Sequence, residues 1–253
     1  MNLRSLSPVL LVAFLVGCQA EEPKAVGTPA KGNPVATGNP STTPTPSGNE
    51  AAPPVAGNAD EVPAELKTAA YEYYGLGNEM PMDMEVKTTA DAGVRTGSQI
   101  TRFKGMEGGK AVYQIERTGG LTELLGQMEV SLENDGIYVK SASMAKVGEH
   151  DIEMPAKLDP GATWEARTVV EQPDRQMNVL VKFTVVGEQS VTTPKGARSA
   201  LLVTSTGTGT MMTKNVRMDS KSWYVKGVGM VKSELKFTDT SGKASTITIQ
   251  EAK

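Results

Sequence analysis

The chain has 253 residues, and its 26 lysines and arginines are slightly outnumbered by 29 aspartates and glutamates, which leaves a net charge of −3. This mild acidity, with no basic cluster interleaved with aromatic residues, excludes a typical nucleic-acid-binding protein. The sequence has one cysteine, Cys18, and one histidine, His150. Those counts exclude an internal disulfide bond and a multi-histidine metal site.

The first 18 residues have the pattern of a secretory signal. A positive charge at Arg4 is followed by the apolar run Val9–Val16 and by the small residue Gly17. The run is far shorter than the ~20 apolar residues that span a bilayer. It ends in Leu15-Val16-Gly17-Cys18, which resembles the lipobox of bacterial lipoproteins. The resemblance implies cleavage between Gly17 and Cys18, with acyl chains such as palmitate on the new N-terminal cysteine.

Acyl chains on Cys18 give the protein a membrane partner, because each buried CH₂ group contributes ~0.8 kcal/mol to membrane binding. The residue after the cysteine is Gln19 rather than the aspartate that retains enterobacterial lipoproteins in the inner membrane. We therefore expect a lipid-anchored protein of the cell envelope. It is placed in the outer membrane if the organism has one, and otherwise on the outer face of the cytoplasmic membrane.

The composition changes after the cysteine, and residues 18–63 are rich in Pro, Gly, Thr, Ala and Asn with few large apolar side chains. Such a segment buries too little surface to offset the entropy lost on ordering. We predict three parts: the signal peptide 1–17, the acylated cysteine with a disordered linker over 18–63, and a folded domain over 64–253.

Residues 64–253 have mostly the alternation of β-strands, so the sequence predicts a mainly β, mainly antiparallel fold with one or two short helices. Pro63–Tyr73 favours a helix that ends at Gly75 and Gly77, and Leu121–Leu125 is a weaker helix candidate. We expect a turn at 134–136, a break at 187–189 and turns at 193–196 and 239–242. The predicted strands are 111–115, 127–133, 137–144, 177–185, 197–206, 231–237 and 244–251.

The sequence offers no catalytic motif, so we expect a protein that is not an enzyme and has no cofactor or metal. Neither the G-x-S-x-G pattern nor the G-x-x-x-x-G-K-[ST] phosphate loop occurs. His150 lies in a polar stretch that favours a solvated loop. Methionines recur at Met80, Met82 and Met84 among thirteen in the chain. They favour ordinary core filling, or else an apolar concave face that holds acyl chains.

Two motifs carry a family resemblance. Pro160, Gly161 and Trp164 form a P-G-x-x-W frame, and residues 223–232 form a W-Y-x-x-G-V-G-x-V-K frame. Both resemble motifs of TapB-like and related exported bacterial proteins of unknown function. The resemblance, over about 71–251, implies a curled antiparallel sheet, a half-barrel similar to the lipoprotein carriers LolA and LolB.

The second motif has a structural interpretation and a functional one. Gly227 and Gly229 indicate a bulge, a sharp bend or a close backbone approach, and Trp223 and Tyr224 are expected on opposite faces. The alternative is that these four residues form the rim of a ligand site. For the whole protein we expect non-catalytic binding, with lipid or lipoprotein acyl chains as ligands. The alternative is a structural or assembly factor that binds an envelope protein or glycan.

The lipobox interpretation predicts the behaviour of a Cys18→Ser variant. Without the thiol, acylation and the cleavage that follows it both fail. The variant should therefore leave the membrane fraction or accumulate as uncleaved precursor, which fractionation and mass spectrometry of the N-terminus detect. A variant that stays membrane-bound and is cleaved normally would contradict the lipobox interpretation.

Overall fold

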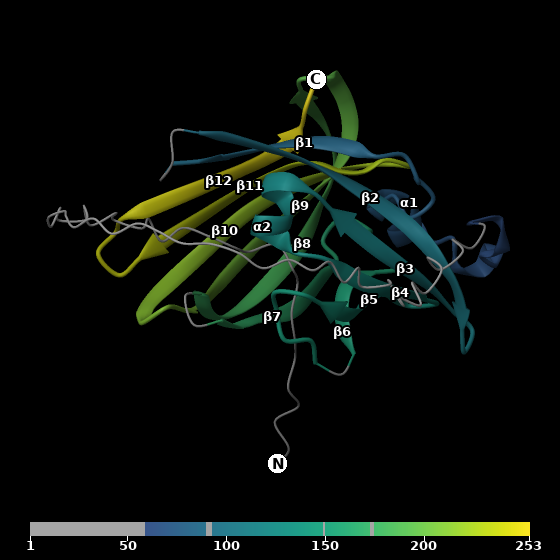
Figure 1. Cartoon of the computed structure of the whole chain (residues 1–253), viewed down its shortest axis with the longest axis horizontal. Helices are drawn as coiled ribbons and strands as arrows, with labels where there is room; N and C mark the ends of the chain where they lie inside the picture. The colour runs from purple at the N-terminus through teal and green to yellow at the C-terminus, as the bar shows by residue number, and fades with distance from the viewer. Residues whose placement is uncertain (1–58, 90–92, 149, 173–174) are drawn as a thin grey trace, which may run out of the picture.

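A computed structural model describes residues 59–89, 93–148, 150–172 and 175–253 (Figure 1). The predicted signal peptide, Cys18 and most of the predicted linker lie outside the described residues. Two short 3-10 helices, η1 Ala59–Glu61 and η2 Ala64–Leu66, come first, and α1 Ala69–Tyr74 follows them. Val62, near the end of the predicted linker, is 3% exposed and packs in the hydrophobic core.

The remaining elements are twelve strands and one further helix. β1 is Met82–Thr88, β2 Val94–Glu107, β3 Lys110–Arg117, α2 Gly119–Leu125, β4 Met128–Glu133, β5 Gly136–Ala142 and β6 Asp151–Pro155. β7 is Thr163–Gln172, β8 Arg175–Thr193, β9 Gly196–Met211, β10 Lys214–Val225, β11 Gly229–Asp239 and β12 Ala244–Glu251.

All twelve strands belong to one antiparallel sheet with the order β6-β5-β4-β3-β2-β1-β12-β11-β10-β9-β8-β7. Two six-strand meanders, β1–β6 and β7–β12, are therefore joined where β1 pairs with β12. The sheet curls until it is nearly closed, with β6 and β7 as its edges. The loop before β6 reaches the other edge, because the Lys146 N–H donates to the Val169 carbonyl in β7 at 2.9 Å.

The inside of the curled sheet is filled by the two helical segments. The segment 59–76 brings Val62, Leu66, Ala70 and Leu76 into a cluster with residues of β2–β9. α2 brings Leu121, Leu124 and Leu125 into a second cluster with residues of β1, β7, β8 and β10–β12. In Figure 1, α1 and α2 occupy different parts of the molecule, so each fills its own region.

The predicted fold class is confirmed, and so are all seven predicted strands, although most are longer than predicted. The expected break at 187–189 is wrong. β8 runs on to Thr193 through a β-bulge between Val185 and Gly187, where Gly187 has a φ of 123°. A bulge absorbs one extra residue without ending the pairing, so the glycine bends the strand.

The prediction of one continuous helix over 63–73 is also wrong, because the segment forms two separate helices, η2 and α1. Thr68 has the extended angles φ −76° and ψ 179°, which separate η2 from α1. This break lets Leu66 and Ala70 both reach the core, where each is buried. The predicted end at Gly75 is confirmed: Gly75 is left-handed, with a φ of 76°, and the Leu76 N–H donates to the Tyr71 carbonyl at 3.2 Å. The weaker helix candidate is α2.

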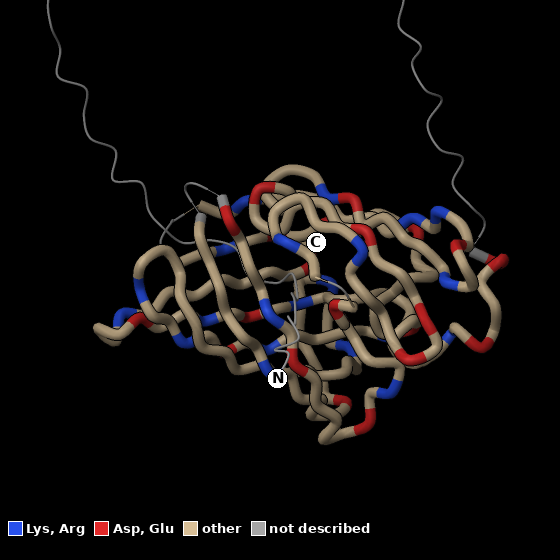
Figure 2. The backbone as a smooth tube through the Cα atoms, turned by 90° about the horizontal axis from the view of Figure 1, so that it is seen from below, with Lys and Arg blue, Asp and Glu red and all other residues tan. Residues whose placement is uncertain are grey.

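Positions of acidic and basic residues are interspersed along the chain (Figure 2). Glu129 accepts hydrogen bonds from Lys104 at 2.7 Å and lies 3.0 Å from the Lys140 ammonium. Partial burial acts against ionisation, but these two lysines hold the pKa of Glu129 below its usual range. Among the described residues, no helix is both long enough and apolar enough to cross a membrane.

Candidate functional site

The turn between β10 and β11, which contains the glycines of the second motif, docks onto α1. The Gly227 N–H donates to the Glu72 carbonyl at 2.8 Å, and the Lys226 ammonium lies 2.9 Å from the Glu72 carboxylate. Sequence positions separated by about 150 residues thus meet at one end of the sheet. The close approach that the motif suggested is therefore made to a helix.

Glycine is needed on both sides of this contact. A Cβ at Gly75 would lie 2.5 Å from the Val228 carbonyl oxygen, closer than two such atoms can approach. A Cβ at Gly229, whose φ is 106°, would lie 3.0 Å from the Tyr74 carbonyl oxygen. Gly227 has a φ of 72° but open space around it. Gly75 and Gly229 therefore let two backbones touch, whereas Gly227 only supplies a left-handed turn residue.

Trp223 and Tyr224 lie on opposite faces of β10, as the alternation of a strand requires. Trp223 is paired with Lys232, whose ammonium lies 5.2 Å from the centre of the indole ring. Tyr224 packs against the inner cluster, together with Tyr73 and Tyr74 of α1. A β-bulge falls between Trp223 and Tyr224. The structure therefore brings Tyr224, Gly227 and Gly229 against α1, whereas Trp223, on the other face, is partly buried against Val191, Ala200 and Val231.

A polar cluster lies beneath this contact, inside the sheet. The Tyr74 hydroxyl donates to Glu153 of β6 at 3.1 Å, and Arg117 of β3 is buried nearby. The Arg117 guanidinium donates to the Gln99 side chain at 2.8 Å and to the Gly126 carbonyl at 3.0 Å. These hydrogen bonds satisfy a buried cation and tie β2 and β3 to the end of α2.

Burial sets the acid–base properties of this cluster. Burial, followed by the negative charge of Glu153, raises the pKa of both Tyr74 and Tyr224 above the ordinary value for tyrosine. Burial also lowers the pKa of the Arg117 guanidinium, while Tyr74 and Glu153 act in the opposite direction. Both tyrosines are therefore neutral hydrogen-bond donors over the physiological pH range.

Sequence reasoning missed the members of this cluster other than Tyr224. Arg117, Glu153 and Tyr74 are far apart in the chain and belong to no recognisable motif. A weak signal was available, because Arg117 ends a strand whose other alternate positions are apolar. The geometry suits a structural role, since the charged groups are buried behind α1 and hydrogen-bonded to the protein.

The first motif, P-G-x-x-W, opens β7. Gly161 has a φ of 89°, and its N–H donates to the Val185 carbonyl at 2.8 Å. Trp164 stacks on Phe183, with ring centres 5.0 Å apart and planes 14° apart. His150, the single histidine, is exposed in the loop before β6, and its ring is nearly perpendicular to that of Tyr138, with ring centres 6.3 Å apart. Within the described residues, no three His, Cys, Asp or Glu side chains gather as a metal site requires.

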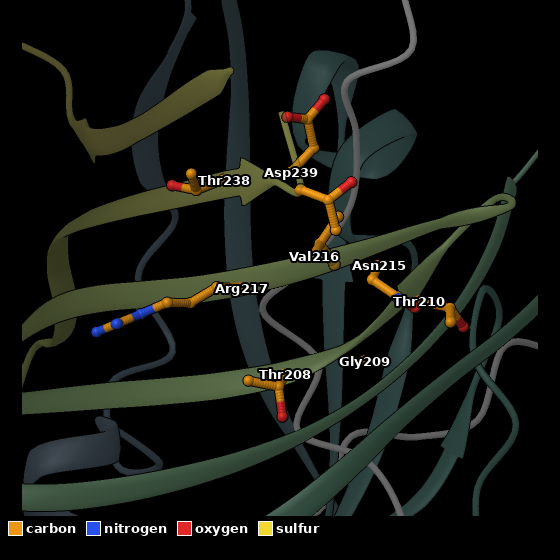
Figure 3. Close-up of a pocket in the computed structure, with 9 residues that line it drawn as sticks. Thr208, Gly209, Thr210, Asn215, Val216, Arg217, Thr238 and Asp239 are labelled. Carbon is orange, nitrogen blue, oxygen red and sulfur yellow. The ribbon is translucent and has the colours of Figure 1, made fainter. Parts of the chain in front are cut away.

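A pocket of about 430 Å³ opens to solvent at one end of β9, β10 and β11 (Figure 3). Its lining surface is mainly apolar, with hydroxyl, amide and charged groups among the carbon atoms, and it lies at the opposite end of β10 from the α1 contact. Its lining residues are Thr208, Gly209, Thr210, Asn215, Val216, Arg217, Thr238, Asp239 and Thr240.

The methionines are divided between core and surface. Met80, which is 72% exposed, lies in the loop before β1. Met82 and Met84 alternate along β1 and point into the core. Other buried methionines are Met128, Met154, Met177 and Met218. Core filling, one of the two interpretations of the methionine pattern, therefore accounts for the buried methionines of the strands, whereas Met106 of β2 is 38% exposed.

Comparisons with known proteins found one family model and two solved structures that are similar to this chain. The DUF3108-like family model matches residues 124–246, which contain both motifs. A Bacteroides fragilis protein with a YmcC-like fold, provisionally described as exported, is 14% identical. Its alignment has a TM-score of 0.48 and covers 72% of this chain and 99% of that one. No curated protein matches the sequence.

A second solved structure is similar to a comparable degree. It is a Parabacteroides distasonis protein provisionally described as a lipoprotein, with 11% identity and a TM-score of 0.47, and it covers 72% of this chain and 98% of that one.

The α1 contact predicts a large stability difference between two glycine substitutions. Gly75 and Gly108 both have positive φ, but only Gly75 faces another backbone, and nothing lies near Gly108. Gly108→Ala should cost about 1–2 kcal/mol, the penalty for a side chain in the left-handed region. Gly75→Ala should cost clearly more, about 3 kcal/mol or above, because the two backbones must separate. Urea unfolding of the full chain measures both. Equal costs would contradict the contact.

The tyrosine pKa shifts predict a loss of stability at alkaline pH. An unfolded tyrosine ionises near pH 10, whereas folded Tyr224 stays neutral to higher pH. Its stabilising contribution is therefore complete below pH 10 and is lost as the pH rises toward the folded pKa. Tyr224→Phe should flatten the decline in unfolding free energy above pH 10 by up to about 1.4 kcal/mol per pH unit. Urea unfolding between pH 8 and 11 tests this, and parallel curves would argue against a buried neutral phenol.

Proposed function

We propose that this protein is a lipid-anchored component of the cell envelope that binds an envelope protein or glycan with the outer surface of its β domain. It acts as a structural or assembly factor. Cys18 attaches it to the membrane, and the segment after Cys18 lets the domain stand away from the lipid headgroups. The outer membrane, or the outer face of a single cytoplasmic membrane, is its location.

The observation that carries this proposal is the filled interior of the sheet. In the α2 cluster, Leu121 and Ile247 are each 1% exposed, and in the α1 cluster, Met128 and Val130 of β4 are 0–1% exposed. A void large enough for water beside these side chains would leave part of their surface accessible to that water. Inward-facing side chains that are so fully covered support close packing, and they leave the outside of the sheet for binding.

The rival function is a carrier of lipid or lipoprotein acyl chains, as the resemblance to LolA and LolB and to TapB-like proteins implies. A carrier needs an apolar space of several hundred Å³. In this chain, α1 and α2 occupy the two regions where such a space would lie. The polar cluster of Arg117 and Glu153 beneath α1 adds charge to one of them. Both features favour surface binding over acyl-chain transport.

Native mass spectrometry of the full-length acylated protein, extracted from membranes in mild detergent, tests the choice. We expect the mass of the polypeptide with its covalent acyl chains and no bound lipid. Leu121→Ala is a positive control, because removing that side chain should create an apolar cavity that admits benzene. The unaltered protein should not bind benzene. Stoichiometric non-covalent lipid on the unaltered protein would overturn the proposal in favour of a carrier.

A further inference from the structure

The outer face of β9, β10 and β11 carries an ordered array of threonines. Along β9, Thr204, Thr206, Thr208 and Thr210 alternate with inward-facing residues, and the last three are exposed. In antiparallel strands, directly paired residues point to the same side of the sheet. Pairing therefore extends the array sideways onto β10 and β11.

Two cross-strand rows of this face reach the pocket of about 430 Å³ (Figure 3). Thr208 is paired with Arg217, which is paired with Thr238. Thr210 is paired with Asn215 in the next row. All five residues line the pocket. They face outward because Val216, between Asn215 and Arg217, is buried in the core. The pocket's volume is within the ~300–1,000 Å³ range of small-ligand sites.

Some polar side chains of this pocket already have hydrogen-bond partners within the protein, and others do not. The hydroxyl groups of Thr208 and Thr210 and the side-chain amide of Asn215 make no side-chain hydrogen bond to another described residue. They are available to a ligand both as donors and as acceptors.

The charged groups of the pocket are already neutralised by the protein. The Arg217 guanidinium donates to both carboxylate oxygens of Asp219 at 2.9–3.2 Å, and this raises the pKa of Arg217. Asp239 accepts hydrogen bonds from the Ser241 N–H at 2.9 Å and the Lys243 N–H at 3.0 Å, and its carboxylate lies 4.0 Å from the Lys214 ammonium. A ligand with a net charge would thus have no free counter-charge among the pocket's own ionic groups.

Hydroxyl groups beside methyl groups, with one amide and balanced charges, match the chemistry of an uncharged sugar. Threonine carries a methyl and a hydroxyl group on the same carbon, and a pyranose ring likewise presents C–H and O–H groups side by side. We propose that the pocket formed by Thr208, Thr210, Asn215, Arg217 and Thr238 binds a neutral saccharide segment of an envelope polysaccharide. The inference rests on the proposed function, for which it names the glycan as the partner.

The test uses the full-length acylated protein in detergent and the neutral tetramer of N-acetylglucosamine as the probe. Calorimetry should detect saturable binding whose affinity changes little between low and moderate salt, because no charge is neutralised. Thr208→Val with Thr210→Val should weaken binding by about fivefold or more, since two hydroxyl contacts are lost while shape is kept. Thr192→Val is the matched control, because Thr192 is an exposed β8 threonine far from the pocket. It should bind like the unaltered protein.

Three results would overturn the inference. One is no binding of the tetramer or of a neutral glucose polymer. Another is unchanged binding by a doubly substituted protein that melts normally. The third is binding only to anionic polymers or anionic vesicles, weakened by salt. Bound lipid inside the domain, in contrast, would overturn the proposed function in favour of a carrier. It would not affect the saccharide result, so the two failures are distinguishable.

Discussion

The contact between Gly75 and the Val228–Gly229 backbone holds the rest of the domain in place. A curled sheet of this length has an open interior unless something fills it, and α1 fills one region because Gly75, directly after the helix, can touch the β10–β11 turn. The Gly227–Glu72 hydrogen bond and the Lys226–Glu72 ion pair then fix the angle of the helix. Because α1 is only six residues long, it gains little from its own helical hydrogen bonds and depends on this docking.

The docked position of α1 explains how the buried polar groups beneath it are stabilised. An arginine and a glutamate inside a β domain are costly unless each is hydrogen-bonded. Arg117 and Glu153 meet that condition through Gln99, Gly126 and Tyr74. Tyr74 comes from α1 itself, so removing the helix would take a hydrogen-bond donor away from the Glu153 carboxylate. The docked helix and the buried polar cluster therefore stabilise each other, and both favour a closed interior over a ligand cavity.

Much of the fold could be predicted from the sequence, and the limits have physical causes. Strands such as β4 and β12 alternate cleanly and are bounded by turn residues, so local pattern suffices. The predicted strand ends before β8 does, because the sequence alone does not distinguish a glycine in a bulge from a glycine in a turn. β2 and β10 were missed because polar residues on both faces blur their alternation. The closure of β1 on β12, and the meeting of Arg117 with Glu153, depend on pairings between distant segments.

The second motif illustrates what a sequence can and cannot say about a site. Of the bulge, bend or close backbone approach that its glycines indicated, the close approach is found at Gly229, but nothing in the motif named α1 as the partner. The threonines of β9 looked like ordinary strand residues until their cross-strand partners and the pocket were known.

Amide hydrogen exchange at Gly227 in the full-length protein tests the central claim most directly. If the α1 contact closes the domain, the Gly227 N–H should exchange only when the whole domain unfolds, at the same free energy as amides in the middle of β10 and β11. Exchange through a local opening several kcal/mol below global unfolding, with the sheet amides still protected, would contradict the account. In that case α1 would be a separable lid and the interior would be open to a ligand.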